Sequence, residues 1–242
     1  MDCSKSAQLA LILIPCCREK RISDPGVEAP PIQGIVPLRE SLIDHIIKTP
    51  ELAKRAENQG GILNREAPRT PARELYCGNL FQACCQALFE KHPSIHILVV
   101  SALYGLTRLG ENLRQYELTM SDKLWDGRLI YRFWENTGLS GVLRQYVRDY
   151  DISCVWSLLP DTQEAPYHRV FRQFWLNPDG AKCYRVKVFL DNGTSAGQGC
   201  GRKRGEWLNQ IISTNPALLC EPKLLPQKFP NIPGFRFDYV QA

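Results

Sequence analysis

The chain has 242 residues, 44% of them hydrophobic, and a net charge of +5 from 30 Lys and Arg residues and 25 Asp and Glu residues. These values predict one compact domain over residues 1–242, ending in an irregular, proline-rich tail from about residue 215. No stretch of about 20 apolar residues occurs, so we expect neither a membrane-spanning helix nor a membrane partner. The charge is modest, so attraction to a polyanion must come from local clusters of basic residues.

Ten cysteines and four histidines raise the question of disulfides or a metal site. A chain of this size without a recognisable signal peptide favours reduced thiols and a cytoplasmic location. No Cys-x-x-Cys pair is present, and no cysteine–histidine spacing is typical of zinc. We therefore expect neither a metal nor a cofactor.

The predicted elements alternate between strands and helices along the chain. Apolar, β-branched runs predict buried strands, and apolar residues at helical spacing predict helices. In the first part of the chain we expect a strand at 9–14, a loop at 23–34, a helix from Pro37 to before Pro50, a loop at 59–73 and a helix at about 79–91. The rest should form strands at 95–101, 154–159 and 184–190, with helices at 139–148, 163–175 and 206–212.

This alternation predicts an α/β fold, with a largely parallel central sheet and helices on both faces. Ligands of such sheets bind beyond the carboxyl ends of the strands. The segments 15–20 and 101–105 are therefore expected at the same edge of the sheet.

The first chemical motif lies where the first predicted strand ends. Cys16 is followed by Arg18, Lys20 and Arg21, and these cations favour a thiolate that could act as a nucleophile. Cys17 should point the other way, because side chains alternate along a strand. The alternative is that both cysteines pack as small hydrophobic residues.

The second motif follows the predicted strand 95–101. Ser101, Tyr104, Gly105 and Tyr116 supply a hydroxyl, two phenols and a closely approachable backbone, which suit a planar polar ligand such as a base. A third motif lies between Pro71 and Asn79. There Asn79 could cap an anion-binding helix and Arg73 could contact phosphate.

His168 is the histidine that we consider as a proton carrier, although a partly exposed helix histidine is the favoured interpretation. The run Arg202, Lys203 and Arg204 is flanked by glycines. It could contact a polyanion or could be a solvated loop.

Three of these segments occur in the order of the YaaA-related family of α/β proteins, which the chain resembles over residues 9 to about 122. They are the cysteine-containing strand end, the segment 71–76 with Gly78, and the segment 101–105 with Tyr116. The resemblance implies a YaaA-like fold and a nucleic-acid partner. The resemblance also implies that Tyr76 and Gly78 bind the substrate.

A narrower likeness concerns Pro15, Cys16 and Lys20, which are similar to the Pro-Cys-x-x-x-Lys start of the archaeosine synthase signature. The Pro-Tyr that follows in that signature is replaced here by Arg21 and Ile22. The chain also resembles the DpdC proteins of bacterial 7-deazaguanine DNA-modification systems. These likenesses imply that a nitrile on 7-cyano-7-deazaguanine in DNA is hydrated to the carboxamide through a thioimidate on Cys16.

The implied roles can be assigned by position. Lys20 or Tyr104 would donate a proton, Glu74 or His168 would accept one, and Ser101 with Gly105 would line the base pocket. The basic residues expected to contact nucleic acid are Arg18, Arg21, Arg73, Arg202, Lys203 and Arg204. RNA is an alternative substrate, and other modification-system proteins are expected partners. Two other functions remain open: a non-enzymatic DNA-binding protein, and a base-excising or glycosyl-transferring enzyme using Glu74 or Asp122.

Overall fold

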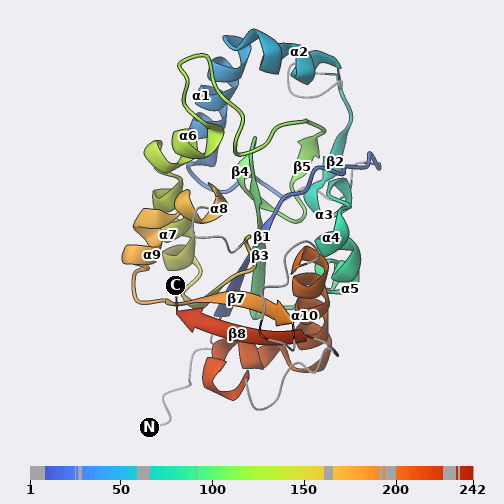
Figure 1. Cartoon of the computed structure of the whole chain (residues 1–242), viewed down its shortest axis with the longest axis vertical. Helices are drawn as coiled ribbons and strands as arrows, with labels where there is room; N and C mark the ends of the chain where they lie inside the picture. Colours follow the sequence, from blue (N-terminus) through green and yellow to red (C-terminus); the bar gives the residue numbers. More distant parts are fainter. Residues whose placement is uncertain are drawn as a thin grey trace.

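The computed structural model describes residues 9–24, 26, 29–58, 66–90, 92–160, 166–190, 193, 200–225, 233 and 235–241. A six-stranded sheet in the order β4-β3-β1-β6-β7-β8 runs through its centre (Figure 1). The strands are β1 Leu9–Pro15, β3 Ile95–Ser101, β4 Gly105–Arg108, β6 Ile152–Ser157, β7 Lys182–Leu190 and β8 Phe235–Gln241.

The inner strands of this sheet are parallel. β1 pairs in parallel with β3 and with β6, and β6 pairs in parallel with β7. β4 and β8 are antiparallel strands at the two edges. Residues 10–14 of β1 are fully buried, as expected for a strand covered on both faces. The predicted α/β fold with a largely parallel sheet is therefore confirmed.

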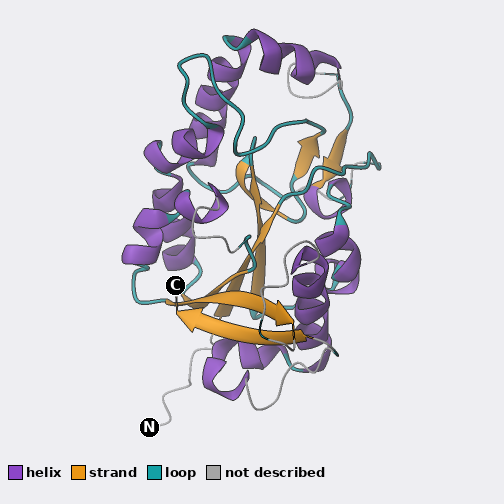
Figure 2. Cartoon of the chain, viewed as in Figure 1, coloured by secondary structure: helices purple, strands orange, loops and turns teal. Residues whose placement is uncertain are grey.

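Helices lie on both sides of the sheet (Figure 2). One group contains α1 Ile35–Ile47, α2 Pro50–Asn58, α6 Ile130–Asn136, α7 Leu139–Asp149, α8 Pro166–Arg169 and α9 Arg172–Leu176. The other contains α3 Ala72–Leu75, α4 Asn79–Ala83, α5 Cys85–Phe89 and α10 Cys200–Thr214. A short antiparallel ribbon pairs β2 Arg69–Pro71 with β5 Asn112–Arg114. No helix in the described ranges has the length and apolar character needed to cross a membrane.

Two predicted helices are interrupted, and one is longer than expected. The helix predicted at 79–91 divides at Cys84 into α4 and α5. There the N–H of Ala87 donates to Asn209 Oδ1 of α10 at 3.1 Å, so a neighbouring helix provides a side-chain acceptor just after the break. The described part of 163–175 forms α8 and α9, whereas α10 begins at Cys200 instead of 206.

The chain beyond residue 215 is more regular than predicted. It forms 3-10 turns at Pro216–Cys220 and Pro222–Leu224, and then β8 pairs with β7 over seven residues. Phe235, Phe237 and Tyr239 alternate with polar Arg236 and Asp238, which is the period of a strand with one packed face. The prolines of this region obscured that alternation in the sequence.

Candidate active site

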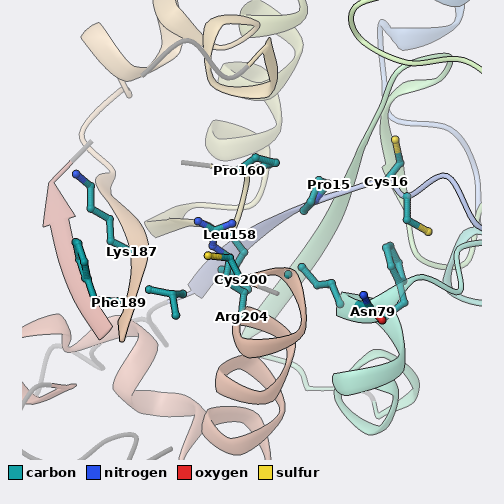
Figure 3. A pocket seen from close by; sticks show the side chains of 14 residues that line it. Pro15, Cys16, Asn79, Leu158, Pro160, Lys187, Phe189, Cys200 and Arg204 are labelled. Atoms are coloured by element: carbon teal, nitrogen blue, oxygen red, sulfur yellow. The ribbon is translucent and has the colours of Figure 1, made fainter. Parts of the chain in front are cut away.

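A cavity of about 650 Å³ lies at the carboxyl ends of β1, β6 and β7 (Figure 3). Pro15, Cys16 and Cys17 border it from β1, Leu158 and Pro160 from the segment after β6, and residues 187–189 from β7. The first residues of α4 and α10 complete the described lining. The cavity therefore occupies the place where ligands of parallel sheets bind.

The two adjacent cysteines have different surroundings. Cys16 Sγ lies 3.2 Å from the hydroxyl of Tyr167 in α8. Cys17 Sγ accepts a hydrogen bond from the N–H of Gly78 at 3.2 Å and donates to the Glu19 carbonyl at 2.9 Å. Burial raises the pKa of Cys17 to about 11. The predicted divergence of the two side chains is confirmed, and Cys16 is the candidate nucleophile.

Gly78 allows this arrangement because it has no side chain. A Cβ at this position would lie 2.8 Å from Cys17 Cβ, closer than real Cβ atoms approach one another. Gly78 is not among the described residues that border the cavity, and the contact that the structure shows for it is with Cys17. Gly78 lets the start of α4 lie directly against the end of β1.

Lys20 folds back toward the cysteines. Its Nζ donates to the carbonyls of Cys17 at 3.0 Å and Arg18 at 3.3 Å, and it lies 4.2 Å from the ring centroid of Tyr116. Burial lowers the pKa of Lys20, while the nearby Cys16 and Cys17 thiols act in the opposite direction. The amine is therefore better suited to exchanging a proton than an exposed lysine would be.

Buried hydroxyls form a chain beside Lys20. The Tyr76 and Tyr116 hydroxyls lie 3.0 Å apart, and Tyr116 lies 2.7 Å from Ser101 Oγ, which accepts from the N–H of Tyr104 at 3.0 Å. Burial first, and the nearby Cys16 second, raise the pKa of both Tyr76 and Tyr116. The structure thus gathers Ser101, Tyr76 and Tyr116 near Cys16, with Ser101 holding Tyr116 in place.

Tyr167 is the residue of the site that the sequence did not identify. Burial and the nearby Cys16 raise the pKa of its phenol well above the ordinary value, so it carries its proton at neutral pH. The sequence singled out its neighbour His168, but adjacent helix residues face different directions. Only the packing of α8 against the end of β1 identifies Tyr167.

Two of the predicted site residues stabilise a turn instead. The Tyr104 hydroxyl donates to the carbonyl of Arg114 and accepts from its N–H, both at 3.0 Å. Gly105 has a φ of +64°, and a Cβ there would lie 3.1 Å from core side chains of Ile35, Leu139 and Trp134. Neither residue is among those that border the cavity.

Glu74 interacts with Ser23 and Arg73 and not with Cys16 in the described contacts. Its carboxylate accepts a hydrogen bond from Ser23 Oγ and lies 3.7 Å from Arg73 Nε. The Arg73 guanidinium lies over the Phe89 ring, 5.2 Å from its centroid. The described contacts therefore do not place Glu74 as a base beside Cys16.

His168 is 8% exposed, so the interpretation of a partly exposed histidine is wrong. Its Nε2 has no hydrogen-bond partner among the described residues. Burial, and then the positive charges of Arg185 and Arg204, lower the pKa of His168 to about 4. His168 is consequently neutral near pH 7.

The predicted basic residues separate into exposed and buried ones. Arg18 is exposed, with its guanidinium 3.5 Å from Glu117, and Arg21 is exposed as well. The run 202–204 lies in the first turns of α10, which corrects the loop interpretation. There Arg202 and Lys203 both pair with Glu206, whereas Arg204 is buried and borders the cavity.

The nine described cysteines are all free thiols. Within the described ranges, no three His, Cys, Asp or Glu residues gather as a possible metal site. No model of a known protein family matches the chain, and no curated protein is significantly similar to it.

Proposed function

We propose that this protein hydrates the nitrile of 7-cyano-7-deazaguanine in DNA to the carboxamide, with Cys16 as the nucleophile. The observation that carries the proposal is the position of Cys16. Cys16 borders a cavity of about 650 Å³, and its thiol lies 3.2 Å from a buried phenol that keeps its proton. The resemblance to YaaA-related and DpdC proteins supplies the identity of the base.

The first step is addition of the Cys16 thiolate to the nitrile carbon. A carbon–sulfur bond forms while one carbon–nitrogen π bond breaks, and the nitrogen takes a proton, which gives a thioimidate. Tyr167 is the proton donor, because its hydroxyl already lies against the sulfur that attacks. The Tyr167 phenolate formed in this step regains its proton from the attacking water.

The second step adds water to the thioimidate carbon and gives a tetrahedral species bearing a hydroxyl, an amino group and the sulfur. Breaking the carbon–sulfur bond returns the thiolate, and loss of the hydroxyl proton leaves the carboxamide. The overall change is the addition of one water molecule. Lys20 gives the nitrogen its second proton and takes up the proton that the hydroxyl loses, a role that suits an amine whose pKa is lowered by burial.

The cavity suits a base that has left the double helix. Its volume of about 650 Å³ lies in the range of about 300 to 1,000 Å³ found for small-molecule sites. Phe81, Leu158 and Phe189 provide apolar lining against which a planar ring can pack. Enzymes that modify a base commonly turn it out of the duplex into such a pocket. A cytoplasmic location, where thiols remain reduced, fits this chemistry.

The test uses a DNA oligonucleotide that contains the cyano base, incubated with the protein, digested to nucleosides and measured by mass spectrometry. We expect the native protein and a Cys17→Ala control to add one water to the modified nucleoside. Cys16→Ala should leave it unchanged. No conversion by the native protein, or equal conversion by Cys16→Ala, would refute the mechanism. An RNA oligonucleotide with the same base compares the two nucleic acids.

The geometry favours this reaction over base excision. Excision needs an essential carboxylate. The Glu74 carboxylate accepts a hydrogen bond from Ser23 Oγ, and Asp122 Oδ1 lies 3.0 Å from Arg55 Nη2. The same digest would reveal excision as loss of the base. A protein that only binds DNA would retard the oligonucleotide in a gel without changing its mass.

A further inference from the structure

We infer that Tyr116 is a positioning residue, whose phenol ring holds the amine of Lys20 beside Cys16 in place of a negatively charged partner. This role rests on the proposed function, in which Lys20 moves protons, whereas the placement of the amine can be measured without a substrate. Lys20 Nζ lies 4.2 Å from the centroid of the Tyr116 ring, and a cation at this distance is attracted to the ring face.

The backbone of Lys20 is fixed by the segment that contains Tyr76. The two residues form an antiparallel β-bridge. Two backbone hydrogen bonds, of 2.8 and 3.2 Å, flank the bridge and join residues 19–21 to residues 75–77. Because the backbone is held in this way, only the long side chain of Lys20 still needs to be placed.

The contacts of the Lys20 amine account for its direction. A charged lysine has three N–H donors. Its Nζ donates to the carbonyls of Cys17 at 3.0 Å and Arg18 at 3.3 Å. Within the described part of the chain, Lys20 has no ion pair with a carboxylate. The face of the Tyr116 ring is therefore the further contact that favours the charged amine.

These surroundings suit a group that must both give and take a proton. A carboxylate would hold the proton firmly, whereas carbonyl groups and a ring face favour the charged form less strongly. Burial lowers the pKa of Lys20, and the nearby thiols and the Glu117 carboxylate act in the opposite direction. The titratable groups around the amine are Cys16 and Cys17 at the end of β1, Tyr76 and Cys77 after α3, and Tyr116 and Glu117 after β5.

The Tyr116 ring is itself held from the neighbouring strand. Tyr116 is 1% exposed, and its hydroxyl lies 2.7 Å from Ser101 Oγ and 3.0 Å from the Tyr76 hydroxyl. Ser101 is fully buried at the end of β3, where its Oγ accepts from the N–H of Tyr104 at 3.0 Å. β3 lies next to β1 in the sheet. The ends of two adjacent strands therefore fix the ring and the amine relative to each other.

The test uses NMR of the full chain with isotope-labelled lysine, in which Lys20→Arg identifies the Lys20 signals. Protons above an aromatic ring face resonate upfield, so we expect the Lys20 Hε signals to lie upfield of those of exposed lysines. Tyr116→Leu should abolish this displacement. It should also lower the pH at which Lys20 loses its proton by about half a pH unit, the loss expected for a weak cation–π contact.

Two further variants separate the ring from other effects. Tyr116→Phe keeps the ring and should retain the upfield displacement of the Lys20 signals. Tyr146→Leu removes a buried ring from a separate cluster, where Tyr146 packs against His96, and should leave the Lys20 signals unchanged.

Three results would each overturn the positioning role. They are ordinary Hε positions for Lys20 in the native protein, an upfield displacement that persists in Tyr116→Leu, and equal loss of the displacement in Tyr116→Phe and Tyr116→Leu. If Tyr116→Leu does not fold, the native and Tyr116→Phe spectra still decide.

The hydration assay adds a readout that a purely structural role would not change. Tyr116→Leu should lower kcat and move the alkaline limb of its pH profile to lower pH, whereas Tyr116→Phe should keep the native limb. A lower kcat with the native pH profile in Tyr116→Leu would contradict the positioning role. The Cys16→Ala variant separates the two proposals, because it should lose hydration while the Lys20 signals stay displaced upfield.

Discussion

At the scale of single residues, strand alternation gives the Cys16–Cys17 pair two chemical characters. The extended backbone at the end of β1 turns Cys16 toward Tyr167 and Cys17 toward Gly78. Cys17 is held by backbone groups, and burial raises the pKa of its thiol. Cys16 instead lies beside side chains that can move protons. The pair therefore divides into one thiol held by backbone groups and one that contacts a phenol hydroxyl.

The role of Tyr167 can be tested by removing only its hydroxyl. In Tyr167→Phe we expect kcat for nitrile hydration to fall about 100-fold with little change in KM, because the proton donor is lost while the ring stays. Tyr150→Phe is the matched control, since its hydroxyl accepts from Arg108 at 2.9 Å in a separate cluster. A Tyr167→Phe enzyme with native kcat would contradict the assignment.

The pKa of Cys17 predicts how it reacts with alkylating reagents. At a pKa of about 11, roughly one Cys17 side chain in a thousand is a thiolate at pH 8. The rate of carbamidomethylation at Cys17, followed by peptide mass spectrometry, should therefore keep rising up to pH 10. The exposed Cys85 provides an internal measure of reagent activity. A rate at Cys17 that levels off below pH 9 would be inconsistent with this environment.

The sequence predicted part of this site because the relevant motifs follow strands. Lys20 follows Cys16 by four residues just after the end of β1, so the sequence alone indicates that the two lie close together. Tyr116 was identified from the motif after the strand 95–101 and Tyr76 from the family resemblance, and the structure places both near Cys16. Tyr167 could not be found in this way, because it reaches Cys16 across 151 positions of sequence through packing of α8.

At the scale of elements, α10 and α4 pack with unusually little space between them. A Cβ on Gly205 would lie 2.4 Å from the carbonyl oxygen of Leu80 and 2.8 Å from Ala83 Cβ. Because both helices contribute lining to the cavity, this packing also sets the distance between two of its walls.

Gly205→Ala should therefore destabilise the protein by about 1 to 3 kcal/mol, as overpacking of a tight contact does. Gly141→Ala, in the exposed first turn of α7, has open space for its Cβ and should stabilise the protein by about 0.4 to 1 kcal/mol. Urea unfolding followed by circular dichroism measures both changes. Equal urea midpoints for the two variants would show that α10 can move away from α4 without loss of stability.

The inner strands could be predicted from the sequence, whereas the edge strands β4 and β8 and the break between α4 and α5 could not. β1 and β3 are continuous apolar runs because both of their faces are covered. β4 has only four residues and β8 carries charged residues on one face, so neither shows a long continuous apolar run in the sequence. The break at Cys84 leaves the apolar helical spacing intact, and periodicity alone does not reveal it.

At the scale of the whole molecule, His168 links stability to pH. Its pKa in the folded protein is about 4, below the ordinary value of 6.5, so folding favours the neutral ring. This contribution is fully present above pH 6.5 and is lost as the pH falls from 6.5 to about 4. A shift of this size corresponds to about 3 kcal/mol.

His168→Gln removes the titrating ring. Between pH 7 and pH 4 the free energy of unfolding should therefore fall by about 3 kcal/mol less in this variant than in the native protein. Urea titrations at both pH values measure the difference. His92→Gln, which changes a histidine paired with Glu90, is the control and should follow the native curve closely. Identical acid sensitivity in His168→Gln and the native protein would exclude a buried neutral histidine.

The central position of β1 in the sheet also affects how fast the protein folds. Its neighbours in the sheet, β3 and β6, come from residues 95–101 and 152–157, so both contacts close long loops. Such distant pairings slow folding. Until they form, Cys16 belongs to an unprotected strand in a chain with several other thiols. Newly made or refolding protein therefore passes through a period in which the Cys16 thiol is most open to oxidation, and a reducing agent should raise the yield of correctly folded protein.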